Sequence, residues 1–485
     1  MTTTPHFSLK IAGHTPIQAT KVDVISPFND QIIGSVEQAN SADIEKALST
    51  AHALYSDRSQ WLPVTQRIAI LEKAITLMKS QAEELALGAA AEGGKPLIDS
   101  QVEMTRCIDS IRACVDGLRN DAPHTIPMGI NPASQHRLTT FKKEPIGVVV
   151  AISAFNHPLN LIAHQVGPAI ATGCPVIVKP AEKTPLSCFR LVEIFHQAGL
   201  PKAWCQALLT DSHDTTETLV TDERVAFLSF IGSAKVGWYL RSKLAPGTRC
   251  ALEHGGVAPV IVTNDADVDA AIAGLSKGSF YHAGQVCVSV QRIYAHSSIA
   301  RDLAMKLAKA AKGLTVGDPT SSNTEVGPII KKSELTRIDD WVKEAIDTGA
   351  ECFSGAEVLP NNCYAPTVLF NPSANAKVSS AEVFGPVVCI YPHDDIDEAI
   401  SRANSLPFSF QASVYSKEID AAMYAADKLN ATAVMINEHT AFRVDWMPFA
   451  GEKHSGLGTG GIPYTMEDMQ VNKMIVITSK GISAS

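Results

Sequence analysis

From residue 146 onward, short apolar runs rich in Val and Ile alternate with longer runs of helical periodicity. We predict strands at 146–152, 176–178 and 225–231, followed in turn by helices at 159–171, 186–198 and 234–244. Apolar strands that alternate with helices of this length are typical of βαβ units around a buried parallel sheet. This alternation places the chain in the α/β class.

A second series of strands begins near residue 258 and suggests a second α/β domain. Its members are predicted at 260–262, 289–294, 387–390, 412–415 and 433–436. A chain of 485 residues exceeds one ordinary core, so we expect two or more domains. Gly255-Gly256 stands at the junction, and ligand sites favour clefts between domains.

The regions before and after these strands have different patterns. Residues 41–120 are predicted to be helical, with Ser41 as an N-cap and one long helix over 66–91 that ends at Gly93-Gly94. A late apolar strand is predicted at 472–478. Such a strand is expected to pair with another part of the chain or with another subunit.

Composition excludes several classes of protein. The hydrophobic fraction of 45% and charged fraction of 19% indicate a globular chain, and the net charge of −9 argues against nucleic-acid binding. Ten cysteines without a CxxC pair suggest reduced thiols. The sequence shows no secretory signal and no apolar run of about 20 residues. We therefore expect a cytoplasmic protein with no membrane or nucleic-acid partner and no metal.

Three residues are candidates for catalysis. Cys287 lies on a predicted loop just before a strand, where a thiol can meet a substrate, although most free cysteines are inert and buried. Glu253 ends an apolar strand beside glycines and is either a surface carboxylate or a general base. Asn156 follows the first strand of the βαβ series, as a turn or cap residue or as an oxyanion donor.

Two further segments suit a nucleotide. Lys179 ends the second strand and Glu182 follows it, at the sheet edge where ligands bind; the alternative is a solvated loop. Gly232 and Ser233 form a turn before a helix, where N–H groups can hold a pyrophosphate, although Gly-Ser turns are common.

Together these segments resemble the aldehyde dehydrogenase superfamily. Its asparagine, KPxExTP, FxGSxxVG, LExGG, GQxC and EVFGPV motifs occur here in that order, and a PFGGxKxSGxG-like segment follows at 448–458. The resemblance extends from about Ser26 to the C-terminal strand. It implies a Rossmann-like NAD-binding domain (1–122 and 143–252), a second α/β catalytic domain (253–450) and a small β oligomerisation arm (123–142 and 460–485). It also implies a homodimer or homotetramer.

The resemblance implies a role for each motif residue. Cys287 matches the nucleophile that forms a thiohemiacetal and then a thioester, Glu253 the general base, and Asn156 the oxyanion donor beside the Cys287 N–H. Lys179 and Glu182 match contacts to the adenine ribose, and Gly232 and Ser233 match the pyrophosphate turn. Glu382 and Phe384 match contacts to the nicotinamide side. NAD is favoured because Glu182 would repel a 2′-phosphate, with NADP as the alternative.

The family's substrate tunnel is polar in this chain. The residues matched to it are Arg106, His157, His164, Arg443 and Phe449. Arginine suits a bidentate grip on an anion, so we expect a short aldehyde with an anionic tail, such as succinate semialdehyde. Branches that act on glyceraldehyde 3-phosphate, lactaldehyde or phosphonoacetaldehyde are also similar. Alternatives are a broad-range enzyme for uncharged aldehydes and a non-redox thioesterase or esterase. Departures from the family pattern are His157, His254 and Ala450.

Overall fold

The computed structural model describes residues 4–15 and 20–482. Residues 41–120 are mostly helical, as predicted: they form α1 (Ser41–Ser56), α2 (Val64–Ser80), α3 (Ala82–Gly93) and α4 (Leu97–Asn120). Two details of the prediction were wrong. Asn40, not Ser41, caps α1, because its side chain accepts from the N–H groups of Ala42 and Asp43. The helix predicted over 66–91 breaks at Gln81, whose φ of −115° and ψ of 10° are not helical.

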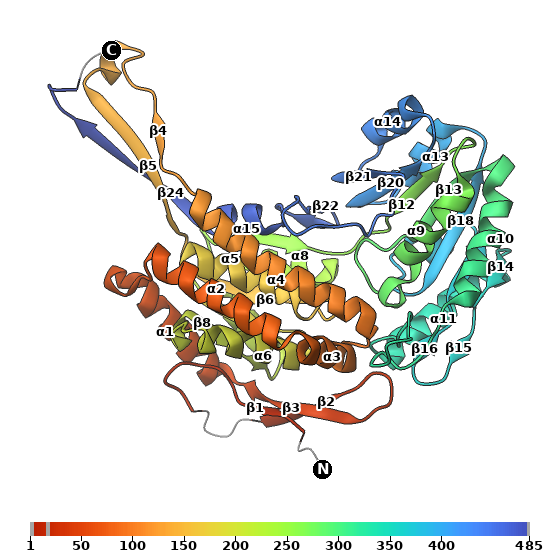
Figure 1. Ribbon diagram of the computed structural model, residues 1–485, viewed down its shortest axis with the longest axis horizontal. Coiled ribbons are helices and arrows are strands. Elements are labelled where there is room, and N and C mark those ends of the chain that lie inside the picture. The colour runs from red at the N-terminus through yellow and green to blue at the C-terminus, as the bar shows by residue number, and fades with distance from the viewer. Residues whose placement is uncertain (1–3, 16–19, 483–485) are drawn as a thin grey trace.

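A six-stranded sheet forms the first α/β layer (Figure 1). Its order is β23 (Gly456–Leu457), β11 (Arg249–Glu253), β10 (Val225–Ile231), β6 (Val148–Ile152), β7 (Val176–Lys179) and β8 (Cys205–Ala207). All neighbours are parallel except β23 and β11. The alternation of apolar strands and helices therefore predicted this sheet correctly.

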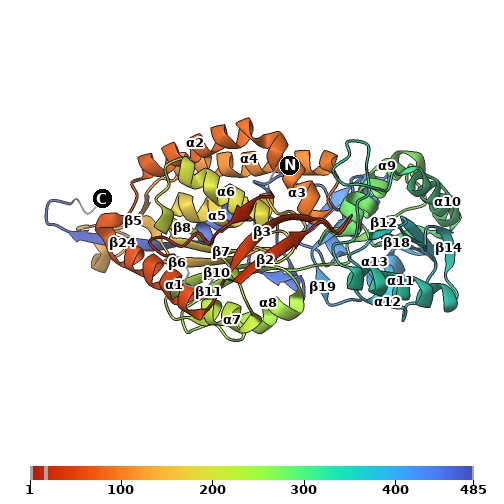
Figure 2. The same cartoon turned by 90° about the horizontal axis from the view of Figure 1, so that it is seen from below.

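Helices cover both faces of this sheet (Figure 2). Val149 and Ala151 of β6 belong to the core that contains α4, α5 (Asn160–Thr172) and α6 (Pro185–Gln197). Val148 and Val150 belong to the opposite core with α1, α7 (His213–Thr221) and α8 (Ala234–Arg241). Because successive strand residues point to opposite faces, a strand buried on both sides reads as a continuous apolar run.

A seven-stranded sheet forms the second α/β layer. Its order is β14 (Glu351–Ser354), β17 (Thr367–Phe370), β18 (Val387–His393), β13 (Arg292–His296), β12 (Pro259–Val262), β20 (Gln411–Tyr415) and β21 (Ala433–Ile436). Its core contains residues of six α-helices: α9 (Val268–Phe280), α10 (Ser297–Gly313), α11 (Lys332–Asp347), α12 (Lys377–Ser380), α13 (Ile396–Ala403) and α14 (Ile419–Lys428). The strand predicted at 289–294 begins only at Arg292, because the loop after Cys287 continues further.

A third sheet projects from the body as an arm (Figure 1). It joins β4 (His124–Ile126), β5 (Arg137–Pro145) and β24 (Gln470–Thr478), and β24 pairs with β5 along its whole length. The late strand thus pairs within the chain, one of the two outcomes predicted. A small sheet of β1 (His6–Phe7), β3 (Ile32–Ala39) and β2 (Thr20–Ile25), extended by β9 (Leu209–Thr210), lies at the opposite side of the body.

Within the described residues, no helix combines the length and apolar character needed to cross a membrane. All ten cysteines fall in this part of the chain and all are free thiols. The boundaries and functions assigned above to the two domains and the arm stay predictions.

Candidate active site

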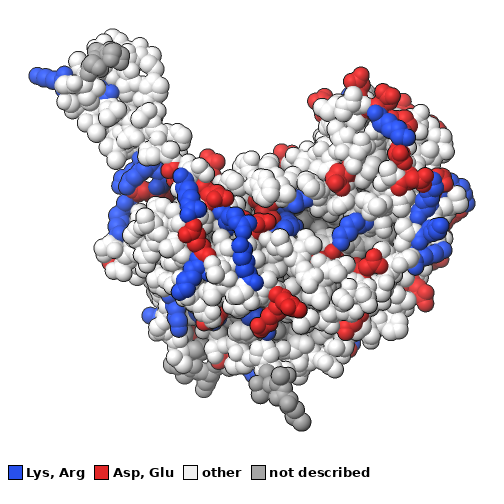
Figure 3. All heavy atoms as spheres, viewed as in Figure 1, with Lys and Arg blue, Asp and Glu red and all other residues white. Residues whose placement is uncertain are grey.

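A cavity of about 500 Å³ lies between the two large sheets, at the carboxyl ends of β6, β10 and β11. Ligands of open α/β sheets bind at this edge. Eleven of the residues singled out from the sequence line the cavity: Arg106, Asn156, His157, Gly232, Ser233, Glu253, Cys287, Glu382, Phe384, Arg443 and Phe449. On the molecular face shown in Figure 3, charges of both signs are interspersed.

Cys287 lies on the loop between α9 and β13, as predicted. A short 3-10 turn (Tyr281–Gly284) precedes it, in which His282 and Ala283 take positive φ angles of 49° and 53°. Of the ten cysteines, Cys287 is the one that lines the cavity. Burial, and then the charge of Glu253, raise the pKa of this thiol well above its ordinary value. At rest the group is therefore a thiol.

Glu253 is the last residue of β11, and its neighbours hold the strand end in place. Gly456 of β23 pairs with it, and the Gly232 N–H donates to its carbonyl oxygen over 3.0 Å. Burial raises the pKa of its carboxyl above the ordinary 4.5, against the charges of Arg443 and Arg106. A carboxylate of raised pKa beside a thiol is suited to proton transfer.

Asn156 connects the first sheet to the cysteine loop. Its Nδ2 donates to the carbonyl oxygen of Gln285 over 3.0 Å, two residues before Cys287. The side chain is buried and lines the cavity. An amide donor held beside a thiol is suited to stabilise negative charge on an oxygen.

The turn before α8 presents backbone donors to the cavity. Ser233 gives α8 no side-chain cap, so N–H groups of the first helical turn are left for a ligand. The Gly232 N–H is not among them, since the Glu253 carbonyl already accepts from it.

Glu382 lies against the glycine pair at the domain junction. The Gly256 N–H donates to Glu382 Oε1 over 3.1 Å, and a Cβ on Gly255 would overlap the carboxylate. Burial raises the pKa of Glu382 to about 7. Phe384, with a φ of 50°, packs edge-to-face on Phe155 and lines the same part of the cavity.

Lys179 and Glu182 flank the cavity and are not part of its lining, although Ala181 between them is. Lys179 is buried at the end of β7, and Glu182 is exposed. Burial lowers the pKa of Lys179, and the charge of Glu182 opposes that shift.

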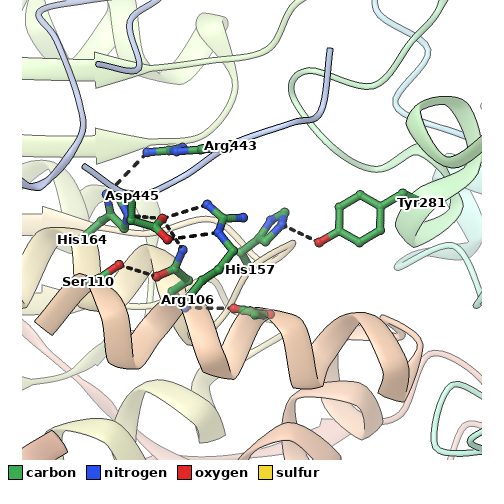
Figure 4. A network of polar contacts seen from close by, with 9 residues as sticks. Arg106, Ser110, His157, His164, Tyr281, Arg443 and Asp445 are labelled. Carbon is green, nitrogen blue, oxygen red and sulfur yellow. Dashed lines mark hydrogen bonds and ion pairs between the residues drawn. The ribbon is translucent and has the colours of Figure 1, made fainter. Parts of the chain in front are cut away.

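Asp445 links two residues of the substrate prediction, Arg106 and His164 (Figure 4). It accepts from Arg106 Nε over 3.1 Å and Arg106 Nη2 over 2.8 Å, and from His164 Nε2 over 2.8 Å. Asn160 Nδ2 adds a bond of 3.0 Å. Burial acts to raise the pKa of Asp445, but the hydrogen bond from His164 and the charge of Arg106 outweigh it, so the pKa lies below its ordinary value.

Asp445 was not among the predicted site residues, although it lies two residues after Arg443. Its contacts bear on the substrate-binding roles predicted for Arg106 and His164. Arg106 lines the cavity but is engaged by this carboxylate, and His164 lies outside the lining, bonded to Asp445.

Arg443 has no carboxylate partner among the described residues. Its Nη2 lies 3.5 Å from His164 Nδ1, and its guanidinium carbon lies 3.5 Å from the ring centroid of Phe449. Its Nε is buried without a hydrogen-bond partner in the described part of the chain. On another wall of the cavity, His157 Nε2 lies 3.0 Å from the Tyr281 hydroxyl.

The other departures from the family pattern lie at the edge of the site. His254 packs between Phe230 and Trp238, with its Nδ1 2.9 Å from the carbonyl oxygen of His454. The Thr432 hydroxyl donates to the carbonyl oxygen of Ala450.

Comparison with known proteins places these features in context. The sequence model described as "Aldehyde dehydrogenase family" matches residues 14–475. The 3-sulfolactaldehyde dehydrogenase of Priestia aryabhattai is 36% identical over 478 residues, which are 98% of this chain and 99% of that protein. Aldehyde dehydrogenase 21 of Physcomitrella patens, solved with the product succinate, superposes with a TM-score of 0.94 at 33% identity and covers 99% of both chains.

A second solved structure resembles the chain to a similar degree. The glyceraldehyde-3-phosphate dehydrogenase of Methanocaldococcus jannaschii, solved with NADP, has a TM-score of 0.90 at 34% identity. The match covers 96% of this chain and 100% of that one.

Proposed function

Because the chain belongs to the aldehyde dehydrogenase family, we propose that its substrate is a short aldehyde with an anionic tail, such as succinate semialdehyde. As a member of this family the chain is an oxidoreductase that oxidises an aldehyde with NAD(P). The observation that carries the anionic tail is Arg443, a cavity-lining arginine with a buried Nε and no carboxylate partner among the described residues.

The cofactor part of the cavity fits a dinucleotide. The uncapped start of α8 offers N–H groups for a pyrophosphate, and Glu382 and Phe384, which line the cavity, would contact the nicotinamide side. Lys179 and Glu182 would hold the adenine ribose. When bound, NAD(P) supplies the acceptor for the hydride. The exposed carboxylate of Glu182 favours NAD, because it would repel a 2′-phosphate.

Cys287 would attack the aldehyde carbon as a thiolate. Its raised pKa means that the proton must leave during the reaction, and the Glu253 carboxylate is close enough to influence the thiol electrostatically. The Asn156 amide and the Cys287 N–H would stabilise the oxyanion of the thiohemiacetal. Loss of hydride then leaves an acyl thioester on Cys287.

Glu253 would complete the cycle as general base. Its carboxylate takes a proton from water, the resulting hydroxide attacks the thioester carbon, and the Cys287 thiolate leaves. The product is a carboxylic acid. Burial, which raises the pKa of Glu253, makes the carboxylate a stronger base than an exposed glutamate.

Relatives support an anionic tail without fixing its identity. One is described as a 3-sulfolactaldehyde dehydrogenase, and another was solved with succinate. Sulfonate and carboxylate differ in shape, but both are anions that a guanidinium can bind.

A kinetic panel tests the proposal. We expect a higher kcat/KM for succinate semialdehyde than for pentanal, an uncharged aldehyde of similar length. Arg443→Ala should lower the value for succinate semialdehyde by about tenfold or more, because a charge-assisted hydrogen bond is lost. The value for pentanal should change little. Arg112→Ala, on an exposed face of α4, is the matched control.

Two results would contradict the proposal. Equal kcat/KM for both aldehydes in the wild type would favour a broad-range enzyme. Hydrolysis of esters without NADH formation from any aldehyde would indicate the non-redox alternative. The same panel with NADP in place of NAD tests the preference assigned to Glu182.

A further inference from the structure

We propose that Asp445 selects the charge of the tail: by neutralising Arg106 it leaves the site one uncompensated guanidinium, that of Arg443, and so favours singly charged tails over doubly charged ones. Carboxylate and sulfonate tails carry one negative charge, whereas phosphate and phosphonate tails carry up to two. The inference rests on the proposed function, because it requires a substrate with an anionic tail.

The pairing of Arg106 with Asp445 is the first observation. Two guanidinium nitrogens of Arg106 bond to the two oxygens of Asp445, at 3.1 and 2.8 Å. The Asp445 side chain is only 2% exposed. A bidentate contact of this kind uses an edge of the guanidinium that could otherwise bind a substrate anion. The positive charge of Arg106 is thus already balanced within the protein.

The two histidines add no positive charge that could balance a second negative charge on the tail. His164 Nε2 donates to Asp445, so in the neutral ring Nδ1 carries the lone pair that faces Arg443 Nη2. Burial lowers the pKa of His164 to about 4, against the hydrogen bond that the ring donates to Asp445. His157 is likewise buried beside Tyr281, and burial lowers its pKa well below the ordinary value. Both rings are therefore neutral near pH 7.

Other charged groups near the proposed tail site are either paired or act against a second negative charge on the tail. Lys95 is paired with Glu103 at 2.6 Å, with both side chains buried. Arg443 keeps its charge, because a guanidinium does not lose its proton in proteins. The ionised carboxylate of Glu253, which lines the same cavity, would further repel a dianion. A monoanionic tail is matched by Arg443, and a dianionic tail exceeds it by one charge.

A pair of probes isolates charge from shape. Sulfoacetaldehyde and phosphonoacetaldehyde have the same length and a tetrahedral head group, but at pH 8 the first carries one negative charge and the second mostly two. For the wild type with NAD we expect kcat/KM to be about tenfold higher for the sulfonate, because one unbalanced charge acts over a few ångströms.

Two variants then separate a charge effect from a structural one. Asp445→Asn keeps the size of the side chain and raises the charge of the site by one, so the sulfonate preference should fall about tenfold or reverse. The double variant Arg106→Gln/Asp445→Asn removes one charge of each sign, so the wild-type preference should return. A purely structural role of Asp445 would leave both variants impaired alike, with no change in the ratio.

A third measurement does not depend on how the variants fold. For the wild type, the ratio of kcat/KM between sulfonate and phosphonate should shrink between pH 8 and pH 6, as the phosphonate gains a proton and the sulfonate does not. A ratio that is constant with pH would overturn the inference, as would equal ratios in the wild type and Asp445→Asn.

These outcomes are distinct from failure of the proposed function. If both anionic probes are used equally well and far better than pentanal, the charge selection by Asp445 is wrong and the anionic tail stands. If pentanal is used as well as the anionic aldehydes, the proposed function itself is wrong.

Discussion

Burial raises the pKa of both the Cys287 thiol and the Glu253 carboxyl, and the charge of Glu253 further raises that of the thiol. Two neighbouring acids of this kind hold their protons more tightly than exposed groups do. The Glu253 carboxylate, which accepts a proton, and the Cys287 thiolate, which attacks the substrate, therefore form only at a pH above the range in which exposed carboxyl groups ionise. Oxidation should accordingly depend on pH through Glu253.

We predict an acid limb in the pH profile of kcat. The general base must be a carboxylate, and burial raises its pKa above 4.5, so activity should fall as the pH decreases through a value above 4.5. Steady-state rates with succinate semialdehyde between pH 5 and 9 measure the limb. In Glu253→Gln the residual rate should be low and should lack it.

Glu382, whose pKa is also raised by burial, provides the control. If Glu382→Gln loses the acid limb while Glu253→Gln retains it, the assignment to Glu253 is wrong. The opposite pattern supports the assignment, because Glu382 lies against Gly256, at the part of the cavity proposed for the cofactor.

At the scale of elements, a buried glutamate of α4 determines where α5 begins. Glu103 Oε1 accepts from the N–H groups of Leu159 and Asn160, at 2.8 and 2.9 Å, in the absence of a side-chain cap on α5 itself. Lys95 Nζ, 2.6 Å from Glu103 Oε2, balances the charge. Both partners are buried, and the same N-terminal segment of α5 follows Asn156 and His157.

We predict that Glu103→Gln lowers the free energy of unfolding by about 3 kcal/mol, because it leaves the buried Lys95 ammonium without a counter-ion. Urea denaturation followed by tryptophan fluorescence measures the change. The exposed α3 residue Glu83 offers a matched control, and Glu83→Gln should change stability by less than about 0.5 kcal/mol.

Lys95→Met/Glu103→Gln should recover part of the lost stability, since it removes the unpaired charge together with its partner. If Glu103→Gln alone were as stable as the wild type, the Lys95–Glu103 pair would contribute nothing to the free energy of unfolding.

At the scale of the whole molecule, the arm is a sheet without a covering layer of helices (Figure 1), and several of its apolar side chains are exposed. Ile477 pairs with Leu138 and Ile475 with Thr140, so these four side chains lie on one face of the arm. Ile475, Ile477 and Leu138 are each more than 40% exposed. Contiguous exposed apolar surface of this kind marks association sites.

We propose that the arm joins subunits in a homodimer or homotetramer. Ile475→Lys/Ile477→Lys should lower the molecular mass measured by analytical ultracentrifugation, because two charges would be buried at the contact. Met305→Lys, at an exposed position of α10, should leave the mass unchanged. A double variant with the wild-type mass at every concentration would show that this face of the arm is not the contact.

The sequence by itself determined the α/β class, the approximate positions of most strands and the order of the motifs. These features are local: strand and helix periods, glycine turns and a loop cysteine are set by residues close in the chain. Each of the catalytic candidates Asn156, Glu253 and Cys287 follows or ends such an element, and all three line one cavity. The break at Gln81 was missed because apolar periodicity continues across it.

Only the tertiary structure decided which charges neutralise one another. Arg106 and Asp445 are 339 positions apart, so no local pattern indicates their contact. From sequence, Arg106 and Arg443 look like equivalent anion ligands, yet burial and geometry pair one with a carboxylate and leave the other facing the cavity. A buried charge must be balanced by whatever the fold places beside it, and that neighbour is known only once the chain has folded.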